Sequence, residues 1–380
     1  MLIKNMPVYW RIKALDASRP QSIPERRDFR FAQSGRGNTL VQQRSNELEK
    51  ILSEIYAAPY NIGYHQEAST FGGGYREDFL EYMRRYLIMY PEIRTILEIG
   101  CGGCLILDEL RKLGYSVAGI DPSPVAAAAA EKLGIALYRG LFPSEQIENK
   151  FDLIFHVDVL EHITDAESFL KAQRDKLKIH GVVIVNVPDA SESIQSGDVS
   201  LAMHQHINYF TKQSLTTLLE QSGFVVENVS KAKYGGSLYA VATRREGTIS
   251  PSVDNVSRDE SRQFLEMAPI TAARVCARIM ELHRELSGNL GFYVPLRAAP
   301  YLALCDYPEN IRVFDDTVHW QGGFIDGLPY KIEGAEALRG KPPAMVCVMS
   351  WTFEEIIRRR IEELRIPGMF VTSLRELCHA

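Results

Sequence analysis

Hydrophobic residues in the middle of the chain form short apolar runs that alternate with amphipathic stretches. The apolar runs predict buried strands, and the stretches between them, such as LILDELRKLG (105–114), predict helices closed by glycine. Strands that alternate with helices in this way predict βαβ units and a parallel sheet. The runs VVENVSKAKY (225–234) and SLYAVATRR (237–245) predict an antiparallel pair at its edge. The four predicted parallel strands are RTILEIG (94–100), YSVAGID (115–121), FDLIFHVDV (151–159) and GVVIVNVP (181–188).

The pattern changes on either side of this region. Residues 1–44 show little periodicity and predict a loosely structured arm, followed by a helix that Ser45 caps and another near 76–89. The polar segment 244–258 contains glycine and proline and predicts a domain boundary. After it comes a long helix and a second, weaker α/β rhythm. The predicted domains are an arm with a helical lid (1–75), a ligand-binding α/β domain (76–245) and a smaller α/β domain (258–380).

Composition narrows the class of protein. The 380 residues are 46% hydrophobic and 24% charged, which is typical of globular proteins, and no apolar run is long enough to cross a membrane. The net charge of −5 and the lack of a basic patch give no reason to expect nucleic acid as a partner. The six cysteines lie apart from one another except for one pair, as in reduced proteins, so we expect a cytoplasmic location.

That pair lies in the stretch EIGCGGC (98–104), which could be a metal site, a redox site or a glycine loop. A structural zinc needs four ligands, and neither a second C-x-x-C nor suitably spaced histidines are present. A dinucleotide-binding loop needs a glycine at Leu105, which disfavours an oxidoreductase using NAD. Asp121 follows the next strand, where a carboxylate can accept hydrogen bonds from ribose hydroxyls. We therefore expect a loop that binds an adenosine ligand, and no metal.

Together, LEIGCGGC, GIDPS, FDLIFHVDVLEHI and GVVIVNVPD resemble the class I S-adenosylmethionine-dependent methyltransferases. The resemblance implies a Rossmann-like, mainly parallel sheet with an antiparallel edge, S-adenosylmethionine as cofactor, and methyltransferase activity. Cys104 replaces the last glycine of the family pattern. The resemblance also implies where the parts of the cofactor lie: the methionine part on the loop, the ribose on Asp121, the adenine beside Leu141 or Phe142, and the sulfonium near His156. The implied cofactor-binding residues are Glu98, Gly100, Cys101, Gly102, Asp121, Pro122, Leu141, Phe142 and His156.

A histidine-rich segment, MHQHINYF (203–210), follows the last central strand, where loops commonly build a binding site. It could bind a metal, pack against the sheet or supply a general base, since imidazole titrates near neutral pH. In an extended segment His204 and His206 would share a face, so direction alone does not choose between them.

This segment, with YGGSLYAV (234–241), DGLPYKI and VMSWTFEEII, resembles the sugar C-methyltransferases, which add a C-terminal α/β domain and act on nucleotide-linked keto-sugars. The resemblance implies that His206 is the base and Gln205 stands where the family has glutamate. Residues 1–95 contain no cysteine, so the family's four-cysteine zinc domain is not expected. Tyr209 is the candidate enolate donor, and a homodimer is possible. The candidate acceptor contacts are Tyr64, His204 and Gln205.

Two alternatives remain: O- or N-methylation of another small metabolite, in which the same His206 would deprotonate the acceptor, and a dinucleotide-dependent oxidoreductase.

Overall fold

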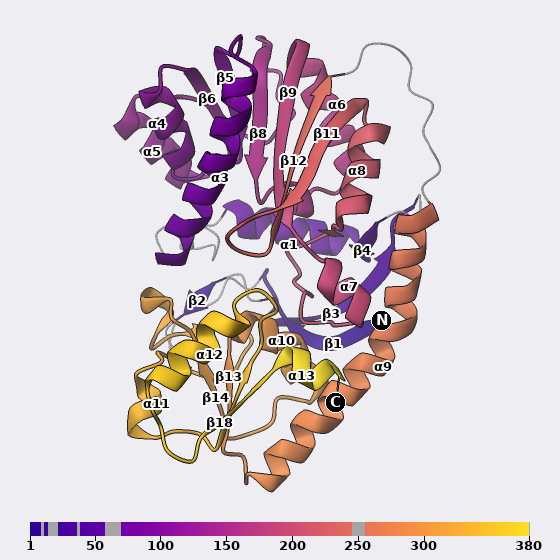
Figure 1. Ribbon diagram of the computed structural model, residues 1–380. Coiled ribbons are helices and arrows are strands. Elements are labelled where there is room, and N and C mark those ends of the chain that lie inside the picture. Colours follow the sequence, from indigo (N-terminus) through magenta and orange to yellow (C-terminus); the bar gives the residue numbers. More distant parts are fainter. Residues whose placement is uncertain (9–10, 14–21, 36–38, 58–69, 245–254, 380) are drawn as a thin grey trace.

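A seven-stranded sheet forms the middle of the protein (Figure 1). The computed structural model describes residues 1–8, 11–13, 22–35, 39–57, 70–244 and 255–379. The strand order is β11-β12-β9-β8-β5-β6-β7, and β5 to β9 pair in parallel. The first five strands in chain order are β5 (Thr95–Ile99), β6 (Ser116–Asp121), β7 (Ala136–Arg139), β8 (Phe151–Val157) and β9 (Leu177–Pro188).

Antiparallel strands complete this sheet at one edge. β12 (Ser237–Arg244) pairs antiparallel with β9, and β11 (Phe224–Lys231) pairs antiparallel with β12. The predicted parallel sheet with an antiparallel edge is confirmed.

Helices cover both faces of the sheet, because its strands are apolar on both sides. Side chains of α3, α4 and α5 pack on one face in a cluster with Ile96, Leu153 and Val241. Side chains of α6 and α8 pack on the other face with Leu97, Ile154 and Val183. The bounds are α3 (Thr70–Met89), α4 (Leu105–Lys112), α5 (Pro124–Leu133), α6 (Ala166–Lys176) and α8 (Lys212–Gln221). The helix predicted at 76–89 begins earlier, at Thr70, and ends at Met89 as predicted.

The N-terminal segment is better ordered than the sequence predicts. β1 (Leu2–Pro7), β3 (Arg26–Gln33), β4 (Leu40–Gln42) and β10 (Asn208–Tyr209) form a four-stranded sheet. The expectation of a loose arm is wrong for these strands, which bury Ile3, Met6 and Phe29 completely. Their partners lie far away in the sequence, so local periodicity does not reveal them. The short strand β2 (Ile12–Lys13) pairs with β15 (Phe324–Ile325), and α1 (Asn46–Ala57) follows β4.

A second parallel sheet, with strand order β16-β14-β13-β17-β18, lies in the C-terminal part (Figure 1). The predicted additional α/β region is thus present. The long helix α9 (Asn255–Glu285) runs along the side of the protein and contains Pro269. The strands are β13 (Leu290–Tyr293), β14 (Ile311–Phe314), β16 (Ile332–Glu333), β17 (Met345–Val348) and β18 (Phe370–Ser373). The other elements here are α10 (Pro295–Leu304), η2 (Val318–Trp320), α11 (Ala337–Gly340), α12 (Glu354–Glu363) and α13 (Leu374–His379).

A buried carboxylate connects the two α/β parts. Asp198 follows the short helix α7 (Ser191–Ser196) and is fully buried. It accepts hydrogen bonds from the Tyr301 hydroxyl at 2.7 Å and the Trp351 indole N–H at 2.9 Å, both in the C-terminal part. One apolar core also joins residues of the N-terminal strands, α7, α9 and β13. No described helix has the length and apolar composition that crossing a membrane requires.

Candidate functional site

The glycine loop lies between β5 and α4, at the carboxyl end of the central strands. Gly100 and Gly102 have φ values of 74° and 44°, which glycine adopts without strain. A Cβ on Gly100 would stand 2.7 Å from Val159 Cγ2, so a side chain there would collide with the next loop. Cys104 also has a positive φ, of 57°, and its side chain makes no capping hydrogen bond to α4. The first N–H groups of α4 therefore remain available to a ligand.

Asp121 holds this loop in place. Its carboxylate accepts hydrogen bonds from the backbone N–H of Gly102 at 3.0 Å and of Ser123 at 2.8 Å. The side chain is almost completely buried. Each carboxylate oxygen has two lone pairs, so Asp121 can still accept hydrogen bonds from a ribose.

The two cysteines of the loop serve packing rather than metal binding. Their Sγ atoms lie 3.7 Å apart, and both side chains belong to the apolar cluster under α4. The contact with Cys104, and then burial, raise the pKa of Cys101, which keeps its thiol neutral and unreactive.

The other candidate cofactor-binding residues differ in how far they are exposed. Glu98 is buried in β5, and Pro122 is exposed beside Asp121. Leu141 is 71% exposed, whereas Phe142 is buried and packs edge-to-face on Phe169, with ring centroids 5.6 Å apart.

His156 has a different position from the one that the resemblance implied. Its ring is completely buried between the sheet and α6, with its centroid 5.7 Å from that of Phe169. Neither ring nitrogen has a hydrogen-bond partner among the described residues. The expectation of an imidazole beside the sulfonium is therefore replaced by a core position, because the side chain of His156 points into the sheet–helix interface.

The histidine segment folds as a turn rather than an extended strand, because the N–H of His206 donates to the Met203 carbonyl at 2.9 Å. His204 and His206 consequently differ in their surroundings. His204 is fully buried; its Nδ1 lies 3.1 Å from the Gln42 amide and its Nε2 lies 3.2 Å from the Arg27 carbonyl. Both ring nitrogens of His204 are occupied, so the structure argues against the predicted acceptor contact there.

His206 is only partly buried, and no hydrogen bond joins its ring to a described residue. Its ring centroid lies 5.0 Å from that of His162. Burial, and then the neighbouring His162 and the positive charge of Arg297, lower the pKa of His206 well below its usual range. The imidazole is therefore neutral at neutral pH and has a lone pair that can accept a proton.

Tyr209, the other predicted catalytic residue, faces the backbone. Its hydroxyl donates to the His206 carbonyl at 3.2 Å and also contacts the backbone of Met203. Burial raises the pKa of Tyr209 far above its ordinary value. This phenol shapes the turn, which argues against its role as enolate donor. Gln205 is buried too, and Tyr64 lies outside the described residues.

Sequence reasoning missed His162 and Glu161, which stand beside His206. They belong to η1 (Leu160–His162), directly after β8. The His162 Nδ1 lies 2.7 Å from the Gln205 carbonyl; since a carbonyl only accepts, Nδ1 carries the proton and Nε2 the lone pair. The segment LEHI could have been found from its position after a central strand, by the rule applied to 203–210.

Two further contacts fasten the loops together. The Ile207 N–H donates to the Glu161 carbonyl at 2.7 Å, and the Asn208 side chain donates to the Ile163 carbonyl at 2.7 Å. The imidazoles of His162 and His206 are thereby held at the same edge of the sheet as the glycine loop.

Comparison with known proteins agrees with this geometry. Residues 69–229 match the family model of a methyltransferase domain. Over 304 residues the chain is 27% identical to the C-methyltransferase NovU of Streptomyces niveus, covering 74% of this chain and 72% of that protein. The chain therefore contains a class I S-adenosylmethionine-dependent methyltransferase domain. Its cofactor is S-adenosylmethionine, and the glycine loop, the uncapped start of α4 and Asp121 fit that ligand.

Other relatives of this methyltransferase match a shorter region. The ubiquinone biosynthesis O-methyltransferase of Dinoroseobacter shibae is 32% identical over 145 residues, which cover 34% of this chain and 58% of that protein. The chain thus spans less than two thirds of that relative. A solved S-adenosylmethionine-dependent methyltransferase from Clostridium acetobutylicum aligns with 44% of this chain and 91% of its own, with a TM-score of 0.38 and 13% identity. The match of residues 69–229 to the methyltransferase family model contradicts the oxidoreductase alternative.

Proposed function

We propose that this methyltransferase methylates a carbon atom next to the ketone of a nucleotide-linked sugar. The main support for this proposal is the imidazole of His206, which stands at the carboxyl edge of the sheet and has no hydrogen bond to a described residue. Both ring nitrogens of the neighbouring His204, in contrast, have partners. When bound, S-adenosylmethionine supplies an electrophilic methyl group. His206 would accept the proton of the acceptor carbon, and the electron pair left on that carbon would bond to the methyl carbon while the sulfur–methyl bond breaks and S-adenosylhomocysteine leaves.

The low pKa of His206 has two consequences for this role. It keeps the base unprotonated, but it also makes the imidazole a weak base, so the developing enolate needs stabilisation. The loop around His162 and the C-terminal part supply the neighbouring polar groups. Their fixed positions would align the acceptor carbon with the methyl donor.

The extent of the similarity to NovU supports a sugar acceptor. That alignment spans 304 residues, whereas the methyltransferase family match covers 69–229 alone. The shared part therefore reaches well beyond the domain that binds the cofactor. The O-methyltransferase relatives resemble this chain over about a third of its length.

A cation from the C-terminal part supports a phosphate-bearing acceptor. Arg297 of α10 is exposed, and its charge acts on His206, Tyr209 and Tyr75. A guanidinium binds phosphate oxygens through paired hydrogen bonds. We propose that Arg297 faces the diphosphate of the acceptor and that the domain 258–380 frames the acceptor site.

The O-methyltransferase relatives favour a second candidate, methylation of a hydroxyl group. The neutral His206 would then accept the hydroxyl proton. The two candidates differ in the bond that is formed, so the product separates them.

The test is a turnover screen with isotopically labelled S-adenosylmethionine against nucleotide-linked 4-keto-sugars, the same sugars without the nucleotide, and phenols. We expect a C–CH₃ product from the nucleotide-linked sugars, detected by NMR. An O–CH₃ product from a phenol, with nucleotide sugars inert, would replace the first candidate with the second.

Two variants probe the roles of single residues in that assay. His206→Ala should lower kcat by roughly 10²–10⁴-fold and leave cofactor affinity nearly unchanged. Arg297→Gln should raise KM for the nucleotide-linked sugar but not for the free sugar. A raised KM with normal kcat in His206→Ala would make that imidazole a pocket residue instead of a base.

A further inference from the structure

Three possible metal ligands meet at the acceptor side of the site. One ligand atom from each of Glu161, His162 and His206 lies within 4.8 Å of the others. We propose that these three side chains form a binding site for one divalent transition-metal cation, and that Zn²⁺ occupies it. The proposal goes beyond the proposed function, which requires no metal.

The chemistry of the three groups fits such a cation. Two imidazoles and one carboxylate suit zinc and its neighbours, whereas magnesium and calcium prefer oxygen ligands. Three protein ligands leave a coordination position open, as in zinc sites that also bind a small molecule. Two ligand atoms about 2.1 Å from one ion lie at most about 4.2 Å apart. The groups therefore need to approach by at most about 0.6 Å, and no described hydrogen bond restrains the His206 ring.

The contacts around His162 prepare it for a metal. The Gln205 carbonyl lies 2.7 Å from Nδ1 and fixes the proton there, so the lone pair is on Nε2, which lies 3.6 Å from Glu161 Oε1. Histidine ligands of metals commonly donate their second ring N–H to a carbonyl in this way. The Tyr56 hydroxyl, 3.0 Å from Nδ1, further restrains the ring.

The buried carboxylate of Glu161 is a second, independent indication of a bound cation. Its side chain is 1% exposed, and its Oε2 atom has no hydrogen-bond partner among the described residues. Its Oε1 atom lies 3.6 Å from the His162 Nε2. A buried carboxylate oxygen without a partner is costly, and a cation would satisfy it. The nearby Asp158 carboxylate adds negative charge, while Arg297 opposes a cation.

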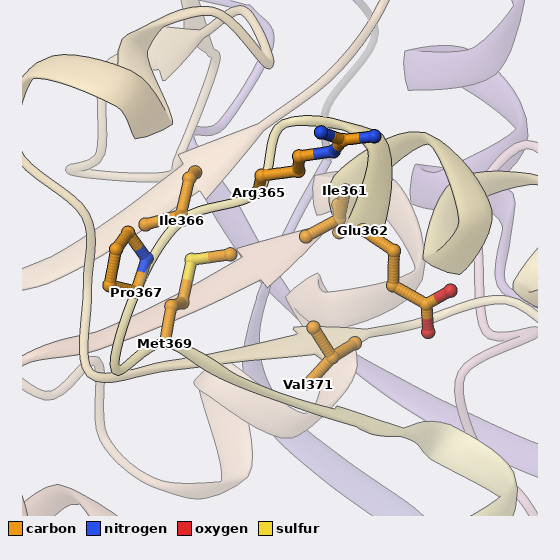
Figure 2. A pocket seen from close by; sticks show the side chains of 7 residues that line it. All are labelled: Ile361, Glu362, Arg365, Ile366, Pro367, Met369 and Val371. Atoms are coloured by element: carbon orange, nitrogen blue, oxygen red, sulfur yellow. The ribbon is translucent and has the colours of Figure 1, made fainter.

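A surface pocket of the C-terminal part lies elsewhere and offers no comparable set of metal ligands. Figure 2 shows a pocket of about 360 Å³ at the end of α12, lined mainly by aliphatic side chains such as Ile361, Ile366 and Met369. It is formed by the C-terminal residues 361–371.

Metal binding and proton transfer compete for one lone pair. If His206 accepts a proton during methyl transfer, an imidazole bound to zinc cannot do so. We therefore expect Zn²⁺ to inhibit turnover of the acceptor found in the screen. Activation by zinc would overturn the role of His206 as base and leave the metal site standing.

The closing experiment needs neither cofactor nor acceptor, so its outcome is independent of the proposed function. The full-length protein is freed of metal with a chelator and titrated with Zn²⁺ in competition with a chromogenic zinc indicator. We expect one zinc per chain. Glu161→Gln and His162→Ala should each weaken binding at least tenfold, and Mg²⁺ should not compete.

Matched variants exclude other zinc ligands. His180→Ala removes an exposed histidine, and the double variant Cys101→Ser/Cys104→Ser removes the loop thiols; both should bind zinc normally. Circular dichroism verifies that each variant is folded. The proposal is overturned by the absence of stoichiometric zinc, by binding that survives Glu161→Gln and His162→Ala, or by binding that depends on the cysteines.

Discussion

Replacing the buried His156 with leucine should stabilise the protein. The side chain is 0% exposed, and both ring nitrogens lack a hydrogen-bond partner among the described residues. A buried polar group left unpaired costs about 1–3 kcal/mol, and leucine is of similar size without that cost. We therefore expect His156→Leu to raise the free energy of unfolding at pH 7 by about 1–3 kcal/mol.

The stability that His156→Leu gains over the wild type should increase as the pH falls. Burial lowers the pKa of His156 to about 3, whereas an unfolded histidine titrates near 6.5. Below about pH 6.5 the unfolded chain therefore binds a proton that the folded protein does not. Wild-type stability falls by up to about 1.4 kcal/mol per pH unit between these two values. His156→Leu lacks this loss, so its advantage at pH 5.5 should exceed that at pH 7 by about 1 kcal/mol.

Urea unfolding followed by circular dichroism at pH 7 and pH 5.5 measures both effects. His180→Leu, at an exposed position, is the matched control and should show no comparable pH dependence. An equal difference at both pH values would mean that the native ring is paired or protonated. Calorimetry with S-adenosylmethionine should give an unchanged affinity; a tenfold loss would return His156 to the cofactor site.

Three further substitutions test the cofactor loop and the junction. Asp121→Ala loses two hydrogen bonds that the carboxylate accepts from backbone N–H groups, each worth about 1.5–3 kcal/mol. Calorimetry should therefore show at least tenfold weaker S-adenosylmethionine binding, and an unchanged affinity would contradict the assignment of Asp121 to the cofactor site. Gly119→Ala places a Cβ 2.5 Å from Cys101 Sγ and should cost about 1–3 kcal/mol in urea unfolding, with partial recovery when Cys101→Ala is added. Asp198→Ala should lower stability by more than about 3 kcal/mol, because the Tyr301 and Trp351 donors lose a charged acceptor; a loss below about 1 kcal/mol would mean that the junction does not depend on it.

Much of the cofactor side could be predicted because it depends on local sequence. Gly100, Gly102 and Asp121 lie on a strand–loop–helix–strand unit whose spacing is visible in the chain. Apolar runs with intervening helices also indicated the parallel sheet. Even here, the sequence did not predict which side chains are exposed: Leu141 is on the surface, and His156 is buried in the core.

The acceptor side was harder to predict because its contacts are non-local. The described strands β1, β3 and β4 pair with one another and with β10, and β2 pairs with β15 more than 300 positions away. Short strands without strong alternation give no signal until their partners are known. Glu161 and His162 went unnoticed because their significance depends on His206, which approaches only when the two loops fold together.

The N-terminal strands help to orient the turn that contains His204 and His206. β4 pairs with β10 through Val41 and Leu40, and the Gln42 N–H donates to the Ile207 carbonyl at 2.8 Å. The Gln42 side chain also contacts His204. These contacts fix the turn from one side, so that His204 faces the N-terminal sheet and His206 faces His162. The N-terminal strands thus supply the partners of the His204 ring, whereas no hydrogen bond joins the His206 ring to a described residue.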